Sequence, residues 1–170
     1  MGQLIEHQRP KSGNADPGER PPRRPPPRMR RVTRARLDPA ALAASVSSPK
    51  HGGLSTFVGV VRSIHAGRRV RGIEYDCFIP LAEKELARIL SQAEKKWPAR
   101  VEAVHRIGSL RVGEASVAVA AGSMHRAEAF AACRWVIDEI KTRLPIWKKE
   151  KYLKGEGRWL PGCSIRHRHS

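Results

Sequence analysis

Apolar and polar positions along the chain switch repeatedly between the spacing of a strand and that of a helix. Residues 54–63 (LSTFVGVVRS) are rich in β-branched and apolar side chains, which predicts a buried strand. The segment 70–78 alternates well enough to be its partner strand, across a turn at 65–69. A short edge strand is expected before this pair, between Val32 and Leu37.

The second half of the chain predicts three more strands. Residues 101–108 and the run of small apolar residues at 115–123 predict a second pair, joined by the turn LRVGE, which contains Gly113. Residues 146–153 (IWKKEKYL) predict a final strand, which a turn at 155–159 follows.

Helix signals separate these strands. Asp38 is a suitable N-cap and Pro39 a suitable first residue for a short helix that ends before Pro49. Pro80 begins a second helix, which Pro98 stops. Charged residues occupy one face of this second helix, and the opposite, apolar face comprises Leu81, Leu86, Ile89, Leu90 and Ala93.

A third, longer helix is predicted from about His125 to Arg143, with Ser123 as its cap and Pro145 just beyond its end. Its core face is expected to contain Phe130, Cys133, Ile137, Ile140 and Leu144. Strands therefore come in adjacent pairs between helices rather than in strict alternation. That order predicts an α+β fold with antiparallel strand pairs and helices on one side, and it shows no internal repeat.

The two ends differ in composition from the middle. Residues 1–30 contain the run ERPPRRPPPRMR, whose Pro and Arg content predicts a disordered, partly polyproline-like tail. A folded domain is expected over residues 31–160 and a basic tail over 161–170. No apolar run reaches the roughly 18 residues of a membrane span, and the N-terminus lacks an apolar signal stretch. We therefore expect a cytoplasmic protein without a membrane partner.

Charge narrows the choice of partner. The chain has 33 Lys and Arg residues against 16 Asp and Glu residues, a formal net charge of +17. Residues 37–170 hold 23 of the basic residues and 13 of the acidic ones, so the excess is not confined to the tail. Such a balance is typical of proteins with an anionic partner, which includes nucleic acid, a phosphorylated metabolite or an acidic protein.

The chain lacks the usual signatures of metal and disulfide chemistry. Its three cysteines, Cys77, Cys133 and Cys163, form no C-x-x-C pair, which argues against a disulfide framework and a thiolate zinc site. The histidines show no paired metal spacing. Phosphate-loop, dinucleotide-binding and nucleophile-elbow motifs are also missing. We expect no metal site.

Basic residues beside strand and helix ends remain as candidates for a binding or catalytic site. Residues 123–126 (SMHR) lie where a strand ends and a helix begins, and the N–H groups of a helix start favour an anion. Arg126 adds a bidentate donor there. Lys141 and Lys148 follow near the other end of this helix. A single lysine is most often a solvated surface charge, so the hypothesis of a functional site rests on these basic residues taken together.

At this point the sequence resembles the molybdopterin synthase catalytic-subunit family. The resemblance rests on LSTFVGVVRS, EYDCFIPLAEKEL and the long stretch KWPARVEAVHRIGSLRVGEASVAVAAGSMHRAEAFAACRWVIDEIKTRLPIWKKE. It covers about Leu54 to Trp159 in matching order and spacing. It implies a hammerhead-type α+β domain with a small additional antiparallel sheet.

The resemblance also implies an activity. Members of this family transfer two sulfurs to cyclic pyranopterin monophosphate, which forms the dithiolene of molybdopterin, and need no cofactor of their own. The sulfur arrives on the C-terminal Gly-Gly thiocarboxylate of a small ubiquitin-like subunit. The catalytic subunit is expected to be a homodimer within a heterotetramer.

Site residues follow from the motifs that match. Lys141 and Lys148 match the family's catalytic lysines, and Glu150 follows them as a residue that orients them by hydrogen bonds. The other matches are residues expected to contact the substrate or to wall its pocket: Arg62 (from the other protomer), His125, Arg126, Phe57 and Met124. Past Trp159 the sequence departs from the family, and Arg158, Arg166 and Arg168 are alternative candidates for one further substrate-binding arginine.

Two other hypotheses remain open from the sequence. The charge and the Arg-Pro tail are compatible with nucleic-acid binding, but aromatic residues make up 5% of the chain, so stacking platforms are scarce and this partner is not favoured. A relative that binds the small subunit without catalysis is the second alternative. The joint presence of Lys141, Lys148, His125, Arg126 and Arg62 argues against it.

Overall fold

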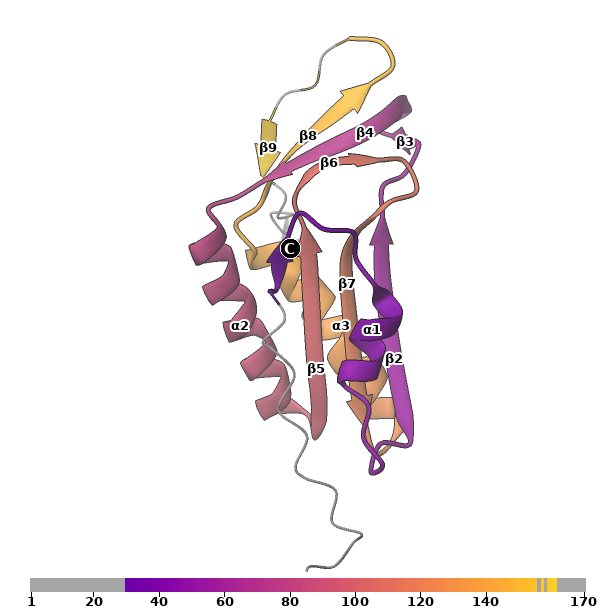
Figure 1. Cartoon of the computed structure of the whole chain (residues 1–170), viewed down its shortest axis with the longest axis vertical. Coiled ribbons are helices and arrows are strands. Elements are labelled where there is room, and N and C mark those ends of the chain that lie inside the picture. Colours follow the sequence, from indigo (N-terminus) through magenta and orange to yellow (C-terminus); the bar gives the residue numbers. More distant parts are fainter. Residues whose placement is uncertain (1–29, 156, 158, 162–170) are drawn as a thin grey trace, which may run out of the picture.

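The first of two sheets forms the body of the molecule. The computed structural model describes residues 30–155, 157 and 159–161. Four strands lie in the order β1-β5-β7-β2, where β1 is Val32–Thr33, β2 is Gly53–Val60, β5 is Ala99–Arg106 and β7 is Ala115–Ser123 (Figure 1). Both β2 and β5 pair antiparallel with β7, whereas β1 pairs parallel with β5. The predicted short edge strand is confirmed as β1.

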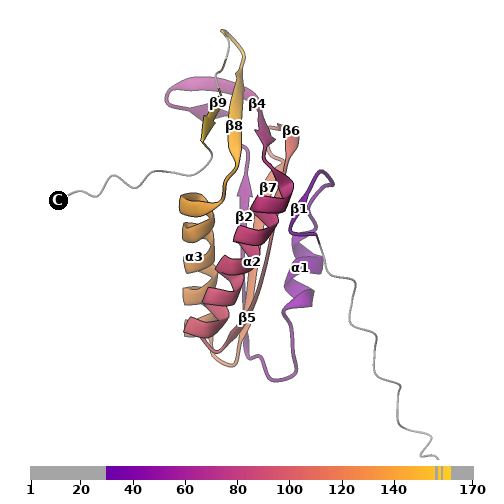
Figure 2. The same ribbon diagram turned by 90° about the vertical axis from the view of Figure 1, so that its left-hand side faces the viewer.

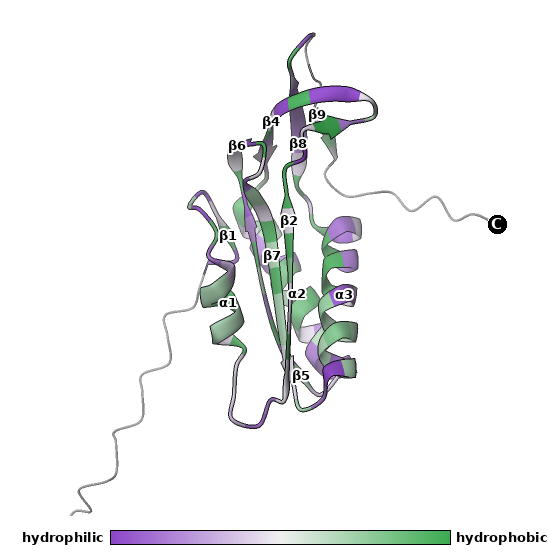
Figure 3. Ribbon diagram, turned by 90° about the vertical axis from the view of Figure 1, so that its right-hand side faces the viewer, coloured by the Kyte–Doolittle hydropathy of each residue, from purple (hydrophilic) through white to green (hydrophobic). Residues whose placement is uncertain are grey.

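Helices cover both faces of this sheet, so the prediction of helices on one side is wrong. Helices α2 (Ile79–Lys96) and α3 (Arg126–Arg143) pack on one face, and α1 (Pro39–Ser45) packs on the other (Figure 2). Leu42 and Val46 of α1 contact Val104 and Ala118 in a small core of their own. Strand β7 is buried along most of its length, because it lies between both layers (Figure 3). Its small, apolar residues suit a strand that is buried on both faces.

The second sheet lies across one end of the first (Figure 1). Its strands are β3 (Ile64–His65), β4 (Arg68–Asp76), β8 (Trp147–Tyr152) and β9 (Trp159–Pro161), in that order, with β6 (Gly108–Arg111) paired to β4 as well. All of these pairs are antiparallel. The predicted α+β class with a small additional antiparallel sheet is therefore confirmed.

One predicted strand pairing is wrong, and two predicted turns overlap with strands. The segment 70–78 does not pair with 54–63, because β2 turns away after Val60 and β4 pairs with β8 in the second sheet. The predicted turn LRVGE is present, because the chain reverses at Val112–Gly113 within it, although its first two residues also form the end of β6. The turn at 155–159 overlaps strand β9, which the sequence pattern did not predict.

Helix starts follow the predicted signals in two of three cases. The Asp38 carboxylate accepts a hydrogen bond from the Ala41 N–H at 2.9 Å, and Pro80 lies in the first turn of α2. Ser123 is not the cap of α3, because it belongs to β7 and its hydroxyl donates to the Pro98 carbonyl at 2.8 Å. The N-cap residue of α3 is His125 instead.

Two residues that were assigned to the core faces of helices are exposed. Leu81 has 51% of its surface exposed and Phe130 has 62%, whereas Ala82 and Ala129 are buried in their place. The other predicted members of both core faces are buried, so each predicted stripe is wrong at one position only. No helix among the described residues is long and apolar enough to cross a membrane.

Candidate functional site

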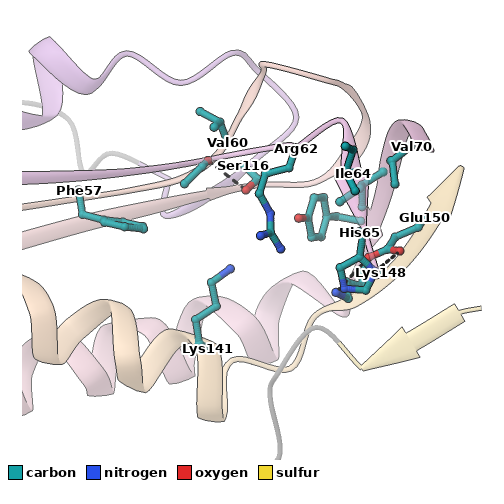
Figure 4. A pocket seen from close by; sticks show the side chains of 13 residues that line it. Phe57, Val60, Arg62, Ile64, His65, Val70, Ser116, Lys141, Lys148 and Glu150 are labelled. Carbon is teal, nitrogen blue, oxygen red and sulfur yellow. Dashed lines mark hydrogen bonds and ion pairs between the residues drawn. The ribbon is translucent and has the colours of Figure 1, made fainter. Parts of the chain in front are cut away.

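A cavity lies where the two sheets and the end of α3 meet, and three predicted basic residues line it (Figure 4). Arg62 follows β2, Lys141 lies in the last turn of α3, and Lys148 lies in β8. This cavity has a volume of about 160 Å³ and adjoins a second cavity of about 280 Å³. The residues that line both cavities are Arg62, His65, Tyr75, Lys141 and Lys148.

Local sequence explains why the lysines converge. The α3 helix ends at Arg143, and the buried side chains of Leu144 and Ile146 anchor the short connection to β8. Lys148 is directly opposite Tyr75 in the β4–β8 pair, and residues that face each other in this way share a face of the sheet. That face is the one toward the cavity, so β8 places Lys148 across from Lys141.

The cavity is positively charged at its mouth. Lys141 and Arg62 are exposed there in the single chain. The pKa of the Lys141 amine is lowered because the cavity walls remove water from it, and because Lys148 and Arg62 add positive charge nearby. An amine of this kind releases its proton more readily than an ordinary lysine, and an anion in the cavity would restore its charge.

Glu150 provides the negative charge of the site. Its side chain is 4% exposed, and Lys148 Nζ lies 3.3 Å from its Oε1 atom. The Tyr152 hydroxyl donates to Oε2, and His65 Nδ1 lies 2.8 Å from the same oxygen. Burial raises the pKa of Glu150, but the Tyr152 hydrogen bond and the charges of Lys148 and His65 outweigh it and leave the pKa lowered. The predicted hydrogen bond between Glu150 and one of the two lysines is present, with Lys148 as the donor.

His105 is a buried member of the second cavity that the sequence reasoning did not select. Its Nδ1 lies 2.9 Å from the Arg106 carbonyl, which can only accept, so Nδ1 carries the proton. Burial, and then the charge of Lys141, lower the pKa of His105 to about 4. The ring is therefore neutral at pH 7, and its edge meets the Tyr75 ring at a centroid distance of 5.3 Å. The HRIG stretch, which begins at His105 and is part of the family resemblance, was the sequence signal that could have identified this residue.

Phe57 lines the first cavity, as expected. Arg62 shares that cavity with Lys141 of its own chain, and its contribution to the pocket of another protomer stays a prediction. Burial raises the pKa of both Cys77 and Cys133, which keeps these thiols protonated. No cluster of three or more His, Cys, Asp or Glu residues within the described ranges could hold a metal ion.

Met124, His125 and Arg126 are not in this cavity. They lie at the start of α3, and Lys141 lies fifteen residues further along the same helix, which corresponds to about 22 Å. All three are exposed at the far end of the first sheet, next to the start of β2. The candidates Arg158, Arg166 and Arg168 lie outside the described residues.

Comparisons with known proteins agree with this architecture. Residues 32–143 match the model of the MoaE protein family. The chain is 41% identical over 140 residues to the molybdopterin synthase catalytic subunit of Synechococcus elongatus, across 79% of this chain and 85% of that protein.

Solved structures give the same result. The crystal structure of molybdopterin synthase from Staphylococcus aureus has a TM-score of 0.73 and 33% identity, over 76% of this chain and 95% of that one. A protein–protein complex of subunits 1 and 2 of molybdopterin-converting factor from Helicobacter pylori has a TM-score of 0.60 over 81% of this chain and 90% of that one. Its identity is 19%, so this last likeness shows the fold alone.

Proposed function

The chain belongs to the MoaE family of molybdopterin synthase catalytic subunits, enzymes of molybdenum cofactor biosynthesis, and from this premise we propose where and how it acts. The reaction is the transfer of two sulfurs to cyclic pyranopterin monophosphate, and the cavity of Lys141 and Lys148 is its site. The observation that carries this proposal is the convergence of Arg62, Lys141 and Lys148 on one cavity.

Charge explains what this convergence achieves. A thiocarboxylate and a phosphorylated pterin are both anions, so their approach in water is opposed by repulsion. Three cationic side chains around a partly enclosed cavity offset that repulsion and stabilise negative charge that develops during transfer. Glu150 is the one carboxylate among the described residues that line the two cavities, and Lys148 partly neutralises it.

The two lysines have different roles in this proposal. The lowered pKa of Lys141 suits a group that exchanges a proton with substrate, because the amine releases its proton more readily than an ordinary lysine does. Lys148 forms an ion pair with Glu150, which fixes the position of its side chain in the cavity. Neither Cys77 nor Cys133 takes part, because their protonated thiols are poor nucleophiles and the partner supplies the sulfur.

The sulfur donor is a small ubiquitin-like subunit with a C-terminal Gly-Gly thiocarboxylate. A narrow cavity suits such a tail, because glycine allows the backbone to approach side chains closely. The complex of subunits 1 and 2 from Helicobacter pylori, which has this fold, supports a two-subunit arrangement. A cytoplasmic location remains a prediction.

A second copy of the chain completes the site in this proposal. Strand β2 forms one edge of the first sheet, and it exposes Leu54, Val58 and Val60. Exposed apolar edge strands favour pairing with another strand. If two β2 edges pair antiparallel about a twofold axis, the Gly53 end of one lies beside the Val60 end of the other.

That pairing would move the distant residues to the cavity. Gly53 packs closely against the start of α3, since a Cβ atom there would lie 3.0 Å from the Arg126 Cα atom. The opposite end of β2 leads directly to Arg62. Antiparallel pairing therefore brings His125 and Arg126 of one copy toward Arg62 and Lys141 of the other, where they can bind the phosphate of the substrate.

A single-turnover assay tests the activity. Purified chain, a thiocarboxylated small subunit and cyclic pyranopterin monophosphate are mixed, and the dithiolene product is followed as its fluorescent oxidised derivative. We expect product from the wild type and a loss of at least about 100-fold in rate from Lys141→Ala, because removing a proton-transfer group typically costs that much.

Circular dichroism and a thermal melt provide the control for folding. Lys141 is exposed, so its truncation should change the free energy of unfolding by no more than about 0.5 kcal/mol. A folded Lys141→Ala variant with the wild-type rate would contradict the proposed site. Absence of product from the wild type, with the small subunit bound, would favour the binding-only relative.

A further inference from the structure

Three aromatic side chains are exposed where the second sheet meets the start of α2. Phe78 has 71% of its surface exposed, Trp147 has 52% and Trp159 has 45%. With Asp76 and Cys77 they line a hollow of about 410 Å³. These three residues form the aromatic patch. None of them lines the two cavities of the site, and exposed Trp and Phe side chains that gather in this way are typical of protein–protein interfaces.

Strand register places the patch on the outer face of the second sheet. Trp147 is directly opposite Asp76, and Lys149 is directly opposite Trp159. Successive residues of a strand point to opposite faces, so Trp147 and Lys149 share one face while Lys148 between them points into the cavity. One end of β8 therefore carries a site residue on one face and the patch on the other.

The second cavity ends beside this patch. It extends from Lys141 and Lys148 to Leu144 and Ile146, which belong to the connection between α3 and β8. Trp147 is the residue that follows this connection. An extended chain spans about 3.3 to 3.6 Å per residue, so a tail of a few residues is long enough to pass from the patch into the cavity.

We propose that the aromatic patch is the surface on which the folded body of the small ubiquitin-like subunit docks. Its C-terminal tail then passes beside residues 144–146 into the second cavity and reaches Lys141 and Lys148. This inference rests on the proposed function, which supplies the identity of the partner. It adds the surface of this chain that binds the body of that partner and the side from which the tail enters.

The position of the patch leaves room for the proposed second copy. The second sheet has the order β3-β4-β8-β9, and β3 follows β2 closely in the chain. The β3 edge therefore lies on the side of β2, whereas β9 and the start of α2 lie on the other side of the molecule (Figure 1). A chain paired through β2 keeps its patch accessible to a different partner.

Charge favours the small subunit over two other occupants. The chain has a net charge of +17, and Lys149 adjoins the patch, so a second copy would bring like charges together. Residues 162–170, which follow β9, hold two arginines and no acidic residue, so they are disfavoured in the same way. The matching surface on the small subunit is expected to be apolar with an acidic rim.

Substitutions on exposed side chains separate the patch from the rest of the surface. Phe78→Ser and Trp147→Ser each remove apolar contact area without a change of charge. Leu81→Ser and Leu153→Ser are a matched pair, because both leucines are about half exposed, at 51% and 55%. Leu81 lies three residues after Phe78, whereas Leu153 is six strand residues from Trp147, about 20 Å away. Circular dichroism and a thermal melt check that each variant folds.

Two binding measurements use the full-length chain and need no catalysis. Calorimetry titrates each variant with the small subunit in its ordinary carboxylate form, which carries no sulfur to transfer. For ¹⁹F NMR, 5-fluorotryptophan replaces the four tryptophans, and Trp147→Phe identifies the signal of Trp147. The shift of this signal between H₂O and D₂O reports whether the side chain meets solvent.

We expect Phe78→Ser and Trp147→Ser to weaken binding by at least about 30-fold, as is typical of aromatic residues at the centre of an interface. Leu81→Ser should weaken binding by a smaller factor, and Leu153→Ser should bind like the wild type. The Trp147 signal should lose its solvent isotope shift when the small subunit binds. With saturating thiocarboxylated subunit, Phe78→Ser should reach the wild-type single-turnover rate, because Phe78 touches neither reactant, whereas Lys141→Ala should not.

Wild-type affinity in folded Phe78→Ser and Trp147→Ser would overturn the docking surface, and so would equal losses in Leu81→Ser and Leu153→Ser. A Trp147 signal that is shielded from solvent in the free chain would do the same. Shielding at every protein concentration would indicate residues 162–170 as the occupant, and shielding only at high concentration would indicate a second copy. If binding depends on the patch but the wild type forms no product, the proposed function fails while the docking surface stands.

Discussion

At the scale of single residues, His105 gives the chain a specific sensitivity to acid. Its pKa falls to about 4 in the folded chain, against an ordinary value of 6.5. The unfolded chain therefore binds a proton at a pH where the folded chain does not. The neutral ring contributes fully to stability above about pH 6.5, and this contribution is lost as pH falls from there toward about 4.

The prediction concerns the pH dependence of the free energy of unfolding. Between pH 7 and pH 4.5 the wild type should lose about 2 kcal/mol more than His105→Gln, because glutamine cannot take up the proton. Urea titrations at the two pH values measure this difference. All other titrating groups, Glu150 included, are shared by the two proteins. Equal losses in both would show that His105 is not the source.

Motifs located some site residues but not others. Lys141 and Lys148 were predicted from the IDEIK and PIWKK stretches, and both line the cavity. His65 and His105 belong to it too, but single histidines at scattered positions give no signal of their own. Their roles depend on the meeting of β3, β4 and β5 at one end of the molecule. This is a property of the tertiary structure, which local sequence patterns do not show. The side-chain contacts of Glu150 could not be read from the sequence for the same reason.

At the scale of elements, local signals predicted the helices and most strands, yet not the pairing of strands. Segments adjacent in sequence usually pair, which is why 54–63 was assigned to 70–78. The turn between them contains a hairpin of its own, β3–β4, which redirects β4 into the second sheet. Strands β6 and β9 were not predicted at all, because each is too short to show an alternating pattern.

The turn of the β3–β4 hairpin contains local backbone strain. Its two connecting residues, Ala66 and Gly67, have φ angles of 46° and 73°. Two-residue hairpins with both φ angles positive favour Asn-Gly, whereas alanine in this conformation costs about 1 kcal/mol. This strained turn sets the position of His65, the preceding residue.

Replacing Ala66 should therefore stabilise the protein. We expect Ala66→Asn to raise the free energy of unfolding by about 0.5 to 1 kcal/mol, because asparagine tolerates the left-handed conformation. Ala66→Val should lower it by more than that, because β-branched residues tolerate this conformation poorly. The side chain at 66 is exposed, so packing does not complicate the comparison. Urea denaturation midpoints in the reverse order would contradict this account of the turn.

At the scale of the whole molecule, the separation of the two basic groups is the main fact to explain. One group surrounds Lys141, and the other, at His125 and Arg126, lies about 22 Å away along α3. The resemblance to the family, which is confirmed, placed all of these residues in one pocket. No sequence pattern indicates whether a pocket is built by one chain or by two. Pairing of two β2 edges is the arrangement that reconciles the motif with the single-chain geometry.

Complementation between inactive variants tests this arrangement. Lys141→Ala and Arg126→Ala are each expected to be inactive as homodimers. In a random mixture half of the dimers contain one chain of each kind, and one of their two sites is then intact. Co-expression should therefore restore about one quarter of the wild-type single-turnover amplitude.

The control is a mixture of Lys141→Ala with Lys148→Ala. Both lysines line the cavity of one chain, so every site in every dimer of this mixture lacks one of them. No activity should return, whatever the assembly. If the first mixture is as inactive as the second, although both variants exchange subunits, then Arg126 and Lys141 do not meet across a dimer interface. Recovery in the first mixture alone would mean that each site takes its lysines from one chain and its substrate-binding Arg126 from the other.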